Sequence, residues 1–181
     1  RWRQTCRTGL DAPRAPHCLA QEDATAAGCS LRRLSRMLDL VRFATGRAKY
    51  LDRAPFERDA TARIFVRIAL ADLEGPRIAQ LDTGAAWSIL DPETAALLGV
   101  ETAGLPFARL STRLGTVNGN LARVPTTLLA EHGSHLDFEG TFFVPRDWPT
   151  GRIFLGYSGL LDRVRFAIDP TTNDFYFGPS G

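Results

Sequence analysis

Alternating apolar and polar residues run through most of the chain from about residue 60 onward. Within residues 60–73, every second position is apolar and would share one face of a strand, namely Ile64, Val66, Ile68 and Leu70. The turn-forming residues 74–76 follow, and residues 77–81 predict the returning strand of a hairpin. This second strand ends directly before Asp82.

The rest of the chain continues the same pattern. Further short strands are predicted over residues 87–90, 136–144 and 152–156, and a closing hairpin over residues 164–178. Residues 107–133 offer two extended runs around residues 114–119, and Asn118-Gly119 is a strong hairpin signal. The pattern predicts a mainly β fold.

Helix signals are few. Asp91 is a natural N-cap, Pro92 suits the first helical position, and Gly99 suits the left-handed position after a helix. Residues 158–163 are compatible with one helical turn. We therefore expect one or two short helices beside the strands.

The N-terminal segment differs from the remainder. Residues 1–36 carry seven arginines against three acidic residues, together with all three cysteines, and show neither helical nor strand periodicity. We assign residues 1–51 to an N-terminal extension, which is either a disordered tail, a targeting arm or sequence upstream of a natural start at Met37. Residues 52–181 are assigned to the folded domain.

Composition and charge argue against several classes of function. The net charge of +2 gives no reason to expect a nucleic-acid partner, and no apolar run is long enough to span a membrane. The cysteine spacings fit no zinc pattern, and the three histidines form no metal set. We expect no metal, no cofactor and a cytoplasmic location.

The sequence around Asp82 carries candidate chemistry. Thr83 supplies a hydroxyl, Gly84 allows a sharp turn that brings its N–H toward the carboxylate, and Ala85 leaves space above the acid. Such a loop holds a carboxylate at the floor of a cleft. On its own, Asp-Thr-Gly is equally good chemistry for an ordinary turn at a strand end.

The motif "LDTGA" resembles the active-site motif of retropepsin-like aspartic proteases, which carry one motif per chain. The resemblance extends to the apolar "IAQL" before Asp82, the "WSIL" strand with the helix after it, and the closing hairpin, and it covers roughly residues 60–178. The stretch "IFLG", which includes Phe154, Leu155 and Gly156, is similar to the apolar strand ending in glycine that packs beside the catalytic loop in that family, here called the second-motif strand.

The resemblance implies a pepsin/retropepsin-like closed β-barrel of one lobe. It also implies an aspartic endopeptidase, in which two carboxylates share a proton and activate a water against a peptide bond. Because no other acid of the chain is followed by Thr-Gly or Ser-Gly, a homodimer with Asp82 from each subunit is expected. The candidate flap over the substrate comprises Leu114, Gly115, Thr116, Val117, Asn118 and Gly119.

One departure from the resemblance is visible. Retroviral members usually pair an acid after the "DTGA" block with an arginine after the second-motif glycine, whereas here the positions hold Ala86 and Tyr157. Both partners of the ion pair are missing together, which fits a cellular or bacterial variant. Two alternatives to a protease stay open at this stage: a non-catalytic peptide-binding or interaction module, and a barrel that only resembles the family.

Overall fold

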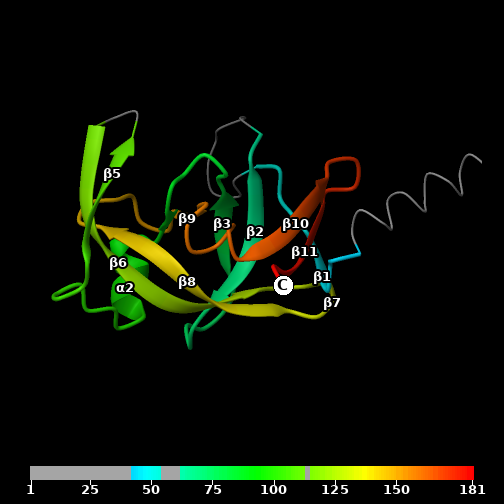
Figure 1. Ribbon diagram of the computed structural model, residues 1–181, viewed down its shortest axis with the longest axis horizontal. Helices are drawn as coiled ribbons and strands as arrows, with labels where there is room; N and C mark the ends of the chain where they lie inside the picture. The colour runs from blue at the N-terminus through cyan, green and yellow to red at the C-terminus, as the bar shows by residue number, and fades with distance from the viewer. Residues whose placement is uncertain (1–41, 54–61, 113–114) are drawn as a thin grey trace, which may run out of the picture. The chain divides into compact units, whose positions relative to one another are not determined.

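The computed structural model describes residues 42–53, 62–112 and 115–181 (Figure 1). The strands of this part are β1 (Gly46–Lys49), β2 (Ile64–Leu70), β3 (Arg77–Leu81), β4 (Ser88–Ile89), β5 (Phe107–Thr112), β6 (Gly115–Leu128), β7 (His132–Gly133), β8 (Leu136–Pro145), β9 (Ile153–Leu155), β10 (Val164–Asp169) and β11 (Asp174–Pro179). Its single helix is α2 (Pro92–Leu97). Nothing in this part of the chain has the length and apolar character of a bilayer-spanning helix.

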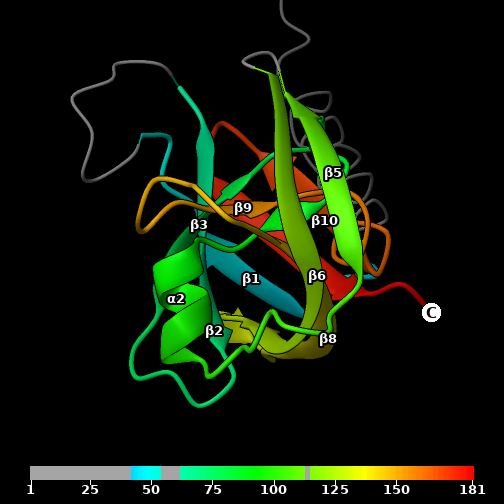
Figure 2. The same ribbon diagram turned by 90° about the vertical axis from the view of Figure 1, so that its left-hand side faces the viewer.

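Six strands form a closed barrel. Their order is β2-β3-β9-β4-β8-β6, and the ring closes because β6 also pairs with β2, where Ile68 lies opposite Leu128. Strand β5 extends the sheet beyond β6, and the two run together as a long hairpin (Figure 2). The predicted fold class, mainly β with a closed barrel of one lobe, is confirmed.

The alternation read from the sequence explains the core. Val66, Ile68 and Leu70 of β2 are buried, as their shared face predicted. They pack in one cluster with Phe142 of β8 and Leu155 of β9. The Asp91 side chain accepts a hydrogen bond from the Thr94 nitrogen at 3.0 Å and caps α2 as expected.

A second sheet has the order β10-β11-β1-β7 and lies at the opposite end of the barrel from the β5–β6 hairpin (Figure 1). The closing hairpin β10–β11 is confirmed, with Asp169 opposite Asp174 at its turn. Strand β1 precedes the expected domain boundary at residue 52, yet it is hydrogen-bonded between β11 and β7. Its residue Ala48 belongs to the same core cluster as Phe177.

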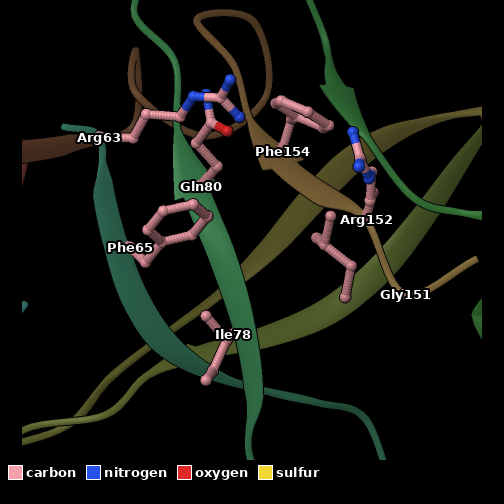
Figure 3. A pocket seen from close by; sticks show the side chains of 8 residues that line it. Arg63, Phe65, Ile78, Gln80, Gly151, Arg152 and Phe154 are labelled. Carbon is pink, nitrogen blue, oxygen red and sulfur yellow. The ribbon is translucent and has the colours of Figure 1, made fainter. Parts of the chain in front are cut away.

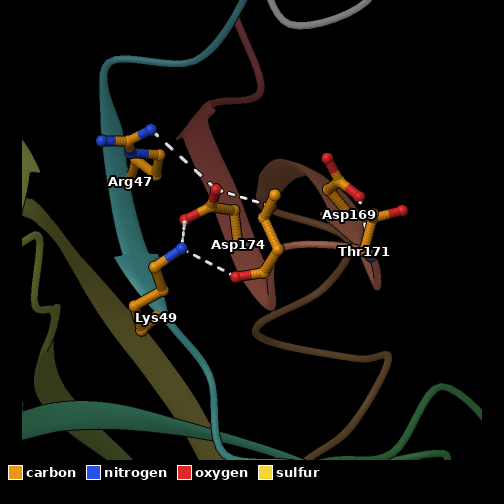
Figure 4. Close-up of polar contacts among 6 residues, drawn as sticks. Arg47, Lys49, Asp169, Thr171 and Asp174 are labelled. Atoms are coloured by element: carbon orange, nitrogen blue, oxygen red, sulfur yellow. Dashed lines mark hydrogen bonds and ion pairs between the residues drawn. The ribbon is translucent and has the colours of Figure 1, made fainter.

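A buried carboxylate ties β1 to β11 (Figure 4). Asp174 is 4% exposed, and its oxygens lie 2.9 Å from Lys49 Nζ and 3.9 Å from Arg47 Nη1, while the Thr172 hydroxyl donates to it at 2.7 Å. Burial raises the pKa of Asp174, but hydrogen bonds from Lys49 and Thr172 and the charges of Lys49 and Arg47 lower it by more. The net pKa lies below the ordinary value, so the anion is retained and anchors β1.

Two local predictions were wrong. Asn118 and Gly119 do not turn the hairpin, because they lie inside β6 opposite Arg109 and Ala108. The end of the hairpin in the described residues is instead the pair of Thr112 with Gly115. Residues 159–163 form turns and no helix, and Ser158 forms a β-bridge with Trp87.

Candidate active site

The Asp82 loop begins where β3 leaves the barrel wall. The Asp82 nitrogen donates to the Leu155 carbonyl at 3.0 Å, which continues the parallel pairing of β3 with β9 by one residue. The Gly84 nitrogen donates to the Asp82 carboxylate oxygen Oδ1, also at 3.0 Å. One carboxylate oxygen is therefore held by the backbone, and the half-buried side chain has a fixed direction.

The segment after β9 braces this loop. The nitrogens of Tyr157 and Ser158 donate to the carbonyls of Ala85 and Ala86, at 2.8 and 2.9 Å. Gly156 makes the approach feasible, because a Cβ there would overlap the Trp87 carbonyl. The predicted second-motif strand thus packs directly against the Asp82 loop.

Ser88 is a positioning residue that the sequence reasoning missed. Its side chain is fully buried in β4, and its Oγ accepts the hydrogen bond of the Gly156 nitrogen at 3.0 Å. The hydroxyl therefore satisfies a buried N–H where the segment after β9 closely approaches the start of β4. A serine in a short apolar run carries no local signal of this role, since its partner is far along the chain.

A cleft of about 690 Å³ opens above the carboxylate. Asp82 is the one acidic residue among the described residues that line it; the others are Gly84, Ala85, Ala86, Ile89, Leu110, Ser111, Thr112, Trp148 and Phe154. Trp148 and Phe154 meet edge to face with ring centroids 5.8 Å apart. The site is thus a single carboxylate in a largely apolar groove, with β5 as one wall.

The predicted site residues fall into two groups. Asp82, Gly84, Ala85 and Phe154 line the cleft, whereas Leu155 and Gly156 are buried beneath the loop and support it. Thr83 is exposed beside the carboxylate. No metal-binding group of three His, Cys, Asp or Glu side chains occurs among residues 42–53, 62–112 and 115–181.

The candidate flap residues lie elsewhere. Leu114 is outside the described residues, and Gly115 to Gly119 follow the hairpin turn along β6. None of these five lines the cleft, whose described hairpin residues are Leu110, Ser111 and Thr112 of β5. Among the described residues, the part of the hairpin that lines the cleft with Asp82 is therefore β5, and the role of the hairpin as a flap stays a prediction.

Solved structures provide two similar folds. One is a retropepsin-like aspartic protease from Rickettsia conorii, with 20% identity, a TM-score of 0.49, and coverage of 73% of this chain and 89% of that chain. The other is the retroviral protease-like domain of Ddi1 from Leishmania major, with 17% identity, a TM-score of 0.44, and coverage of 66% and 94%. No protein-family model matches the sequence, and no curated protein matches it either. Of these two solved structures, one is described as a retropepsin-like aspartic protease, the group that the Asp82 motif resembles, and the other as a retroviral protease-like domain.

Proposed function

We propose that the protein is an aspartic endopeptidase that acts as a homodimer on peptide or protein substrates. The observation that carries the proposal is the Asp82 carboxylate, which lines the floor of an open, largely apolar groove and is oriented by the Gly84 N–H at 3.0 Å. A groove of this volume has room for several residues of an extended peptide.

The chemistry requires a second carboxylate. In the proposed reaction, one ionised Asp82 takes a proton from a water while the protonated Asp82 of a second copy polarises the peptide carbonyl. Water oxygen bonds to the carbonyl carbon, giving a tetrahedral intermediate. Proton transfer to the amide nitrogen then allows the C–N bond to break, which yields a free carboxyl group and a free amine.

The surface around Asp82 supports pairing with a second copy. Thr83, Gly84 and Ala86 are exposed on the loop itself, and Tyr157, hydrogen-bonded to the loop through its backbone, is 60% exposed. A twofold axis beside Asp82 would bury these residues and bring two carboxylates together. Because Ala86 and Tyr157 replace the usual ion pair, this contact would depend on packing instead of charge.

We expect the specific activity to depend on protein concentration. Dilution below the dissociation constant of the dimer separates the two Asp82 residues, so activity per chain falls on dilution and levels off at high concentration. Initial rates of peptide cleavage are measured over a dilution series, together with sedimentation velocity at the same concentrations. A chain that sediments as a monomer at every concentration and cleaves at a constant specific rate would exclude the shared dyad.

A further inference from the structure

A second, small pocket adjoins the Asp82 cleft (Figure 3). We call it the arginine pocket; its lining residues are Arg63, Phe65, Ile78, Gln80, Gly151, Arg152, Ile153 and Phe154. The residues come from the neighbouring strands β2, β3 and β9 and the segments just before β2 and β9. Phe65, Gln80 and Phe154 form one row across these strands, since Gln80 is paired with both phenylalanines.

The arginine pocket lies next to the cleft. Phe154 lines both cavities, so its ring is the shared wall between them. Gln80 lies two residues before Asp82 and therefore projects to the same side of the strand. Arg63 directly precedes Ile64, which is paired with Leu81, the neighbour of Asp82. These positions place the pocket beside the part of the cleft that holds Asp82.

The polar side chains that line the pocket are rich in hydrogen-bond donors. Two arginine side chains and a side-chain amide line it, and none of the lining residues that the structure describes is acidic (Figure 3). A guanidinium carries five N–H donors, so it can bind a carboxylate while keeping other interactions. The cavity is only about 10 Å³, which suits one small polar group and excludes a bulky apolar side chain.

We propose that the arginine pocket selects substrates with a carboxylate side chain, glutamate or aspartate, near the scissile bond. One carboxylate oxygen would enter the pocket, while the arginine side chains at its rim donate charge-assisted hydrogen bonds. This inference rests on the proposed endopeptidase function. It adds a preference for an acidic substrate side chain to a cleft that is otherwise largely apolar.

The test uses matched peptides. A cleavable peptide is made with glutamine at each position around the scissile bond in turn, and each is compared with the peptide carrying glutamate there, which has nearly the same shape. We expect glutamate to raise kcat/KM by about tenfold at one or two positions, as for a hydrogen bond to a charged group. Equal rates for glutamate and glutamine at every position would overturn the proposal.

Variants connect the preference to the pocket. In a variant with both Arg63→Gln and Arg152→Gln, the kcat/KM values for the glutamate and glutamine peptides should lie within about twofold of each other. The reason is that the glutamine amide retains hydrogen-bond donors but lacks the charge of arginine. Arg152→Lys should retain part of the preference. Arg67→Gln is the matched control, since Arg67 is on β2, the strand that directly follows Arg63, but forms an ion pair with Glu131 at 3.3 Å outside the pocket. If the double variant still prefers the glutamate peptides, other residues cause the preference and the proposal is contradicted.

Failure of the protease function can be separated from failure of the pocket. If the wild-type protein cleaves no peptide, the same glutamate and glutamine peptides are labelled and their binding to the Asp82→Asn protein is measured by fluorescence anisotropy. Tighter binding of a glutamate peptide, lost in the added Arg63→Gln and Arg152→Gln background, would support the pocket while the protease proposal fails. Equal binding of every pair would overturn the pocket as well.

Discussion

We expect the replacement of Asp82 with asparagine to abolish peptide cleavage while leaving the fold and the proposed dimer intact. The asparagine oxygen can still accept the Gly84 N–H that Asp82 Oδ1 accepts at 3.0 Å, so the loop keeps its shape. Neither subunit then has a group that can take up or release the proton of the attacking water. Loss of general acid–base catalysis alone reduces rates by about 10²–10⁴-fold, and turnover should fall to background in a mass-spectrometric assay against a peptide library.

Asp169→Asn is the matched control for this substitution. Asp169 also ends a strand and also accepts a backbone N–H from two residues ahead, that of Thr171 at 2.9 Å, but it lies outside the cleft (Figure 4). The same chemical change there should leave cleavage within about twofold of wild type, as is usual for surface substitutions away from a site. If the Asp82→Asn protein still cleaves, or if Asp169→Asn is the inactive variant, the assignment of the catalytic acid is wrong.

Gly156→Ala should be strongly destabilising. The added Cβ would overlap the Trp87 carbonyl and lie 2.7 Å from the Ser88 nitrogen, and both are backbone atoms that cannot move aside as a flexible side chain could. Strands β9 and β4 would have to separate, and the hydrogen bond from the Gly156 nitrogen to Ser88 Oγ would be lost. We expect a loss of about 3 kcal/mol or more in the free energy of unfolding, a fall of roughly 10 °C in Tm, and loss of activity.

Gly84→Ala provides the comparison for folding. A Cβ at Gly84 would lie 3.4 Å from Asp82 Oδ1, which is an ordinary contact distance. Thermal unfolding of the two variants is compared with that of wild type by circular dichroism. A Gly156→Ala protein that melts with wild type would show that the close approach of the second-motif segment to the Asp82 loop is not required for the fold.

Local patterns predicted most of the strands. The alternation of Ile64, Val66, Ile68 and Leu70 determined both the strand and its inward face, because the side-chain period of a strand is two and one face must be buried. The position of Asp82 at a strand end followed from the same pattern. These features depend on neighbours in sequence, which a single chain displays directly.

The errors come from long-range contacts. Asn118-Gly119 has strong turn chemistry, but Gly119 is paired with Ala108 on one side and Pro145 on the other, and a Cβ there would overlap the Val144 carbonyl. Its missing side chain allows strands β6 and β8 to approach closely, and no turn is needed. The pairing of β1 with β11 and the bond between Ser88 and Gly156 also join distant segments. Neither contact can be predicted from the neighbouring residues in the sequence.

In the proposed enzyme, two copies of Asp82, one from each chain, form the catalytic site. The most direct test of this shared site mixes wild-type and Asp82→Asn chains at constant total concentration, after the subunits have exchanged to equilibrium. If both carboxylates are needed, only wild-type homodimers are active, and an equimolar mixture retains about a quarter of the wild-type rate. Activity that instead falls in proportion to the wild-type fraction, to about half in that mixture, would show that one Asp82 per active unit suffices and would contradict the shared site.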